Sequence, residues 1–202
     1  FREAPWPARV LLIGLGAGSL AKFVYHHLPE ARVTVVEIAP EVHAVAHQYF
    51  RLPDEGERLE VHIGDGAEFV QDDPRQWDLI AVDGFDRHAR AGALATQPFY
   101  AACRARLATD GILSVNLFGQ LRGFKTQLQR LRKAFDGQVL DLPECDSGNV
   151  VALASPAAGQ SFDLATLKSR AANLKAVTGL DLRPTLRRLE KSGACPDGSV
   201  SL

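Results

Sequence analysis

Short apolar runs alternate along the chain with amphipathic stretches, and this alternation predicts a parallel sheet. The run at residues 9–13, Arg-Val-Leu-Leu-Ile, is branched and ends in glycines, which is typical of a buried parallel strand. Similar runs predict strands at residues 9–13, 32–37, 59–63, 77–83 and 112–117. Helical periodicity and start or stop signals predict helices at residues 19–28, 40–50, 67–70, 97–107 and 124–135. Strand and helix thus alternate, which favours a mostly parallel sheet with helices on both faces.

The segment after residue 135 completes this sheet. Residues 139–140 and 149–154 predict two closing strands, so the expected fold is α/β, a Rossmann-like seven-stranded sheet. We expect residues 1–160 to form the main domain and residues 161–202 to be a helical extension of it. The last part, residues 192–202, is expected to be frayed.

Length and composition are those of one globular domain with a single core. The chain has 202 residues, of which 46% are hydrophobic. A net charge of −1 gives no reason to expect nucleic acid or an anionic membrane as a partner. No apolar run has membrane length and no signal-peptide pattern opens the chain, so we expect a cytoplasmic protein. Its three cysteines are far apart and are expected to be reduced.

The sequence does not begin with an initiator methionine, so spacings are reliable only within unbroken motifs. The sequence begins at Phe1 and contains no methionine. We therefore expect the initiator to lie outside these 202 residues, and whether an N-terminal segment also does is left open.

A glycine loop follows the first predicted strand. Gly14, Gly16 and Gly18 allow a ligand to approach the backbone closely, and the following helix offers its N-terminal amides. Glu37 closes the second strand, where a carboxylate accepts hydrogen bonds from both hydroxyls of a ribose. The loop and the acid predict a nucleoside site, but they fit NAD and adenosyl sulfonium ligands equally.

Two turns after later strands hold further carboxylates. Asp65 and Gly66 follow the third strand, where the Asp either caps a helix or accepts the amino group of an adenine. Asp83 and Asp86 follow the fourth strand. They either stabilise a turn or hold an amine nucleophile and accept its proton.

Other polar features have plainer explanations. His43 and His47 are four residues apart on one helical face, but they lack the Glu of the metalloprotease pattern. We expect a solvated or hydrogen-bonded pair there and no metal. The basic stretch at residues 122–133 has the apolar spacing of an ordinary amphipathic helix.

Taken in order, the four motifs resemble the spermidine synthases, which have the class I S-adenosylmethionine-dependent methyltransferase fold. The matching segments run Gly-Leu-Gly-Ala-Gly-Ser-Leu, Val-Val-Glu-Ile, Gly-Asp-Gly-Ala-Glu-Phe and Asp-Leu-Ile-Ala-Val-Asp-Gly-Phe-Asp. The resemblance implies a reaction in which decarboxylated S-adenosylmethionine donates an aminopropyl group to an amine. It implies the following roles: ribose and adjacent nucleoside contacts for Glu37 and Ile38, adenine contacts for Asp65 and Gly66, and catalysis for Asp83 and Asp86.

The sequence also departs from that family. Ala17 stands where the family's loop usually carries an Asp that binds the donor's amine, so ordinary S-adenosylmethionine is an alternative donor. The family's N-terminal β-domain is not found in these residues. A methyltransferase with an unknown acceptor and a non-catalytic nucleoside-binding domain therefore stay open. An NAD dehydrogenase is disfavoured because its motif needs glycine at Ser19. The expected partner is a small amine or other nucleophile, and a homodimer is left open.

Overall fold

The computed structural model describes residues 7–85, 91–119 and 123–202. Its main feature is one seven-stranded sheet in the order β3-β2-β1-β4-β5-β7-β6. Only β7 runs antiparallel to its neighbours β5 and β6. The strands are β1 (Arg9–Ile13), β2 (Arg32–Glu37), β3 (Leu59–Ile63), β4 (Trp77–Val82), β5 (Leu107–Phe118), β6 (Val139–Asp141) and β7 (Asn149–Ala154).

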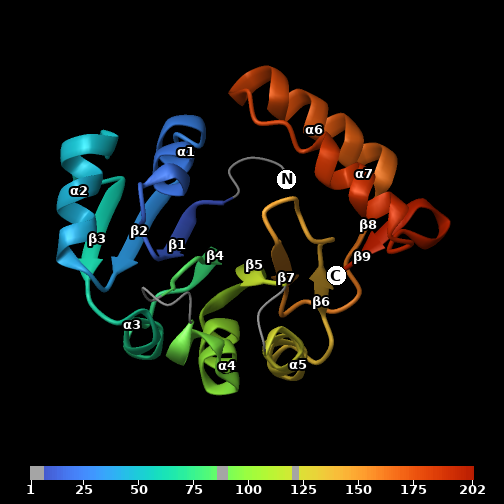
Figure 1. The fold of residues 1–202 in the computed structure, drawn as a ribbon, viewed down its shortest axis with the longest axis horizontal. Coiled ribbons are helices and arrows are strands. Elements are labelled where there is room, and N and C mark those ends of the chain that lie inside the picture. The colour runs from blue at the N-terminus through green and yellow to red at the C-terminus, as the bar shows by residue number, and fades with distance from the viewer. Residues whose placement is uncertain (1–6, 86–90, 120–122) are drawn as a thin grey trace.

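Helices cover both faces of this sheet (Figure 1). One face carries α1 (Ser19–His27) and α2 (Pro40–Phe50). The other carries α3 (Gly66–Asp72), α4 (Gln97–Arg106) and α5 (Phe124–Ala134). The predicted Rossmann-like fold is confirmed.

The central strand β1 shows why the sequence folds in this way. Val10 and Leu12 face the core under α1 and α2, whereas Leu11 and Ile13 face the core above α3, α4 and α5. All four side chains are at most 3% exposed. Each contributes about 1.5–3 kcal/mol by leaving water. A continuous apolar run is therefore what a strand with two buried faces requires.

Strand β5 begins earlier than the strand predicted at residues 112–117. The strand begins at Leu107, opposite Trp77, and its register against β4 then shifts, so that Leu79 pairs with Ile112. The extra residues are accommodated as an irregularity within the strand rather than as a separate turn. A side chain at Gly111 would lie 2.8 Å from the carbonyl oxygen of Trp77, so the close approach requires glycine.

The C-terminal segment contains helices α6 (Leu164–Thr178) and α7 (Arg183–Lys191), which pack together at the β6 end of the sheet (Figure 1). The expectation of a frayed end over 192–202 is wrong. Strand β9 (Ser199–Ser201) pairs antiparallel with β8 (Ser161–Asp163). Val200 and Leu202 are buried, and the amide of Leu202 donates to the carbonyl of Gln160. Burial of two alternate apolar side chains holds this end in place.

Two 3-10 turns complete the elements, η1 (Gly92–Ala95) and η2 (Pro196–Gly198). Among the described residues, no helix combines the length and the apolar character needed to span a bilayer.

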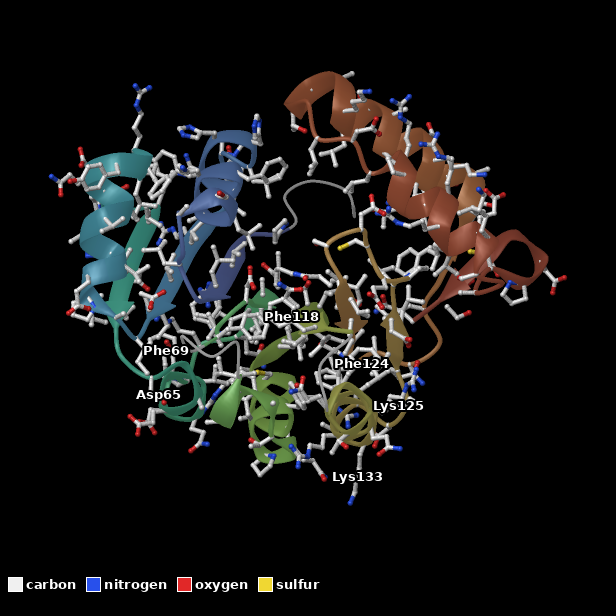
Figure 2. All side chains as sticks on the ribbon, viewed as in Figure 1. Asp65, Phe69, Phe118, Phe124, Lys125 and Lys133 are labelled. Carbon is white, nitrogen blue, oxygen red and sulfur yellow. The ribbon has the colours of Figure 1, made fainter. Side chains whose placement is uncertain are left out.

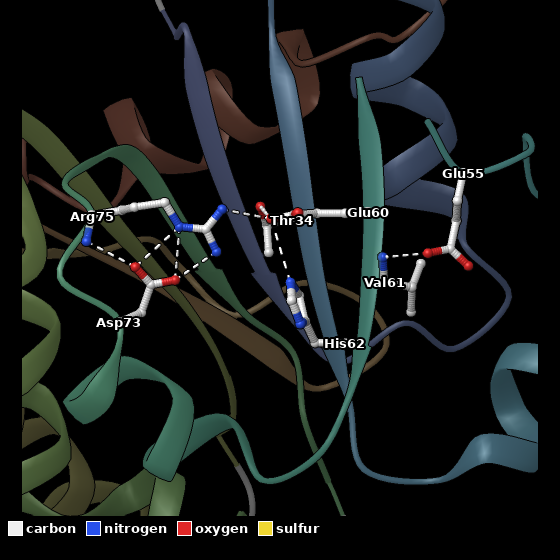
Figure 3. A network of polar contacts seen from close by, with 7 residues as sticks. All are labelled: Thr34, Glu55, Glu60, Val61, His62, Asp73 and Arg75. Carbon is white, nitrogen blue, oxygen red and sulfur yellow. Dashed lines mark hydrogen bonds and ion pairs between the residues drawn. The ribbon is translucent and has the colours of Figure 1, made fainter. Parts of the chain in front are cut away.

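An ion-pair network ties β2, β3 and the entry to β4 together (Figure 3). The Arg75 guanidinium donates to the carboxylates of Asp73 and Glu60, and Thr34 also donates to Glu60. Burial raises the pKa of Glu60 and of Asp73, but these hydrogen bonds outweigh burial, so both pKa values lie below their ordinary range. The hydrogen bonds that Arg75 donates to Asp73 raise the pKa of Arg75.

We predict that Arg75→Gln lowers the free energy of unfolding at pH 7 by about 1–2 kcal/mol. Depressed carboxylate pKa values stabilise the fold above the ordinary values of 4.5 and 3.8, and this stabilisation is lost as the pH falls through the folded-state values. The difference between wild type and variant in urea titrations should therefore shrink as the pH falls below the ordinary carboxylate values. Arg183→Gln, which breaks an exposed pair with Asp181, serves as the control and should change little.

Candidate functional site

The carboxyl ends of four strands meet at one edge of the sheet, at the point where the strand order reverses. β1 pairs with β2 on one side and with β4 on the other. Beyond the strands, the amide of Gly14 donates to the carbonyl of Val36 at 2.9 Å, and the amide of Asp83 donates to the carbonyl of Ile13 at 2.9 Å. In open α/β sheets, ligands bind in the crevice formed at such a reversal.

The glycine loop is held close to the end of β4. Gly14 has φ of +97°, and a side chain there would lie 2.4 Å from the carbonyl oxygen of Asp83. Only glycine tolerates both conditions. Gly18, the N-cap of α1, approaches Leu52, whereas Gly16 has no atom within 4 Å of the position that a Cβ would take. The loop therefore packs at both ends and is open in the middle.

Glu37 joins the glycine loop to the start of α2. The amide of Leu15 donates to its Oε2 at 2.9 Å, and the amide of Ala39 donates to its Oε1 at 3.0 Å. The side chain is only 7% exposed. Each carboxylate oxygen has a second lone pair, so Glu37 can still accept one hydrogen bond at each oxygen.

Asp65 has the helix-capping role that the sequence left as one alternative. Its Oδ1 accepts from the amides of Ala67 at 2.7 Å and Glu68 at 3.3 Å, and it begins α3 beside Phe69 (Figure 2). A side chain at Gly66 would lie 2.4 Å from Cγ2 of Ile13. Glycine at this position lets α3 approach the end of β1 closely.

Asp83 follows β4 directly and is exposed, and its Oδ1 accepts a hydrogen bond from Nδ2 of Asn116 at 2.8 Å. The side chain of Asn149 in turn donates to Oδ1 of Asn116 at 3.1 Å. Hydrogen bonds thus run from Asn149 on β7 through Asn116 on β5 to the carboxylate of Asp83. Sequence reasoning did not single out Asn116 or Asn149. The signal in the sequence was weak, an Asn in each of two largely apolar strands.

Aromatic and aliphatic side chains flank these acids. The rings of Phe85 and Phe118 lie 4.6 Å apart between centroids. Phe85 comes two residues after Asp83 in the chain, and Phe118 ends β5 (Figure 2). Ile38 follows Glu37 and is 69% exposed, which is unusual for a large apolar side chain beside a buried strand. Asp86 lies outside the described residues.

A separate cavity of about 180 Å³ lies at the opposite edge, where the strands begin. Its lining includes Arg9, Arg32, Arg75 and Trp77. It is too far along the strands to include the glycine loop, Glu37 or Asp83, so it is distinct from the edge described above.

The geometry at the carboxyl edge suits a nucleoside beside a nucleophile. A buried carboxylate with free lone pairs, an open glycine loop and a helix N-terminus lie on one side of the reversal. An exposed carboxylate held by an amide lies on the other side. The two sides are joined through the contact between Gly14 and Asp83.

Comparison with solved structures gives the class of fold. The chain resembles human Methyltransferase-like protein 13 in complex with SAH, with a TM-score of 0.72 and 24% identity over 95% of this chain and 84% of that one. It also resembles a spermidine synthase in complex with the transition-state analogue AdoDATO, with a TM-score of 0.66 and 28% identity over 75% of this chain and 56% of that one. The protein has the class I methyltransferase fold.

Sequence comparison then gives the family. Residues 2–143 match the spermine/spermidine synthase domain, and the chain belongs to that family. A polyamine aminopropyltransferase of Neisseria meningitidis serogroup A is 38% identical over 186 residues, which are 92% of this chain and 71% of the relative. The polyamine aminopropyltransferase of Chromobacterium violaceum is 34% identical over the same shares.

We predict that Gly14→Ala destabilises the fold more than Gly16→Ala does. Both substitutions place an alanine at positive φ, which costs about 1–2 kcal/mol. Only the first drives a Cβ into the carbonyl of Asp83, which adds about 1–3 kcal/mol. Urea unfolding of both variants measures this difference. Equal losses would contradict the close approach of the loop to β4.

Proposed function

We propose that this chain is an aminopropyltransferase that moves an aminopropyl group from a decarboxylated S-adenosylmethionine to a small amine such as putrescine. Family membership supports the class of reaction. The observation on which the proposal depends is the Asp83 carboxylate, which is exposed, held by Asn116 and fixed by its backbone to the nucleoside loop.

In this proposal, the nucleoside lies along the ends of β1, β2 and β3. The ribose hydroxyls donate to the two remaining lone pairs of Glu37. The adenine amino group donates to Oδ2 of Asp65, which takes no part in the helix cap made by Oδ1. Ile38 contacts the purine, because an exposed branched side chain suits a flat apolar ring. Gly16 and the start of α1 lie beside the donor's tail.

The reaction needs little covalent chemistry from the protein. The amine nitrogen attacks the carbon beside the sulfonium, a C–N bond forms, and the C–S bond breaks to release a neutral thioether nucleoside. The protein mainly holds the two reactants together. An amine has a pKa of about 10 and is protonated at neutral pH, so a base must remove or orient its proton.

Asp83 is the proposed base. Its Oδ1 is held by Asn116, so the carboxylate has a fixed orientation and keeps lone pairs for the incoming amine. Asn149 fixes Asn116 in the same way. The Phe85 and Phe118 rings offer an apolar surface next to this acid for the methylene groups of the acceptor. Asp86 is proposed as a second acid for the amine.

One feature favours a second candidate, methyl transfer from ordinary S-adenosylmethionine. Ala17 lies in the loop between Gly16 and Gly18, and α1 has no acidic residue in its first turn. A helix N-terminus without nearby acids attracts a carboxylate, which the decarboxylated donor lacks. The choice of donor therefore separates the two reactions.

The remaining proposals concern the protein's setting. We propose a cytoplasmic protein in which Cys103, Cys145 and Cys195 stay reduced, consistent with their free state. Residues 161–202 are proposed to extend the main domain. A small amine is the proposed partner, and no metal is required for the transfer step.

We predict that Ile38→Ala weakens binding of methylthioadenosine about threefold to tenfold without lowering the melting temperature. The side chain is exposed, so its loss removes ligand contact and little packing. The matched control is Val177→Ala on α6, which is 70% exposed and distant from the loop. Calorimetric titration measures both affinities, with NAD as the ligand expected not to bind. Equal affinities in the two variants would remove Ile38 from the site.

We predict that Asp83→Asn lowers turnover by about 10²–10⁴-fold while methylthioadenosine still binds. The carboxamide keeps the size of the side chain but cannot accept the amine proton. Wild type and variant are incubated with putrescine and each donor, and the products are separated. Spermidine from the decarboxylated donor supports aminopropyl transfer. A methylated amine from the other donor supports the second candidate, and nucleoside binding without either product indicates a binding domain.

A further inference from the structure

Two histidines and a glutamate converge away from the nucleoside edge. His43 and His47 lie four residues apart on α2, and Glu55 comes from the segment between α2 and β3. One ligand atom from each residue lies within 4.8 Å of the other two. The sequence alone suggested no metal at the histidine pair, because the third residue is separated from it by a loop.

The contact between His43 and Glu55 has the spacing of two metal ligands. Nε2 of His43 lies 3.2 Å from Oε1 of Glu55. Zinc bonds to imidazole nitrogen and carboxylate oxygen are about 2.0–2.2 Å long, which places two ligands of a tetrahedral ion about 3.3 Å apart. Yet this buried nitrogen makes no hydrogen bond, because its geometry towards the carboxylate is unfavourable. A cation between the two atoms would satisfy both.

The second imidazole is already placed on the same side. The rings of His43 and His47 lie 4.8 Å apart between centroids in an edge-to-face arrangement, and one nitrogen of each ring lies within 4.8 Å of the other. Residues four apart on a helix share one face, so this pair needs only small side-chain rotations to coordinate one ion.

The backbone holds Glu55 in position. Arg51 ends α2 with φ of +54°, which reverses the chain, and Leu52 is buried beneath the helix. The amide of Val61 donates to Oε2 of Glu55 at 3.0 Å (Figure 3). The other oxygen, Oε1, is the one that lies 3.2 Å from Nε2 of His43. A hydrogen bond to the second oxygen of a ligating carboxylate is the usual support for a metal ligand.

We propose that His43, His47 and Glu55 form a binding site for a zinc-class divalent cation that fastens the segment after α2 to that helix. Two imidazoles and one carboxylate suit Zn²⁺, Ni²⁺ or Cu²⁺ and disfavour Mg²⁺, which prefers oxygen ligands alone. Three protein ligands leave a fourth position for water. The site is separate from the transfer reaction and does not depend on its assignment.

Binding is tested on the tag-free chain after treatment with a chelator. The protein should compete with a chromophoric indicator for one equivalent of Zn²⁺. Free Zn²⁺ at a hundred times its Kd should raise the Tm of the protein by about 5–10 °C, whereas Mg²⁺ should not. Co²⁺ should give the visible absorption of a tetrahedral site. A thiolate charge-transfer band would instead assign the ion to Cys145 or Cys195 and overturn the proposal.

Three variants locate the ion. His43→Ala and Glu55→Gln should each weaken Zn²⁺ binding about tenfold or more. Glu55→Gln keeps an oxygen for the amide of Val61, so it tests the ligand without breaking the loop and decides the question if His43→Ala fails to fold. His62→Ala is the control, since His62 also lies near a carboxylate, Glu60, but without a second imidazole. Unchanged affinity in both test variants would overturn the proposal.

Discussion

The approach of Gly14 to the backbone of Asp83 is the constraint on which the site depends. A side chain at Gly14 would lie 2.4 Å from the Asp83 carbonyl oxygen, so the end of β1 passes the end of β4 with no room for any residue larger than glycine. The amide of Asp83 donates to Ile13 at the same place. These contacts hold the glycine loop and Asp83, the proposed base, in one rigid unit. Because β1 is buried on both faces, neither side of this contact can move without disturbing the core.

Glu37 extends the same unit to the next helix and has to serve two purposes. Its two oxygens accept the amides of Leu15 and Ala39, so the acid fixes both the glycine loop and the start of α2. A ligand that binds to its remaining lone pairs would meet a carboxylate already oriented and already removed from water. The proposed cation site lies on the same helix, so α2 is held at its N-cap by Glu37 and, at the end of its first turn, by the contact of His43 with Glu55.

The sequence predicts the sheet well because each parallel strand is a continuous apolar run between two helices. It predicts the placement of Glu37 and Asp83 because residues that follow parallel strands must meet at one edge. It does not predict Asn116, whose role appears only when β5 pairs beside β4. The pairing of β8 with β9 likewise cannot be predicted from the sequence, because three-residue strands are too short to show a periodicity. Contacts between a helix and the loop that follows it, such as that of His43 with Glu55, cannot be predicted for the same reason.

The two sides of the proposed site respond to different charges. Asp83 is an exposed acid, and as the proposed base it suits a nucleophile that has a proton to give up, as an amine does and a thioether does not. In the second candidate reaction, the start of α1 would bind the donor's carboxylate, because the helix offers free amides and has no acidic residue in its first turn. Ala17 removes the local charge that would otherwise oppose such a group. In this proposal Asp83 at the end of β4 sets the acceptor, whereas the choice between the two donors depends on the first turn of α1, on the other side of Gly14.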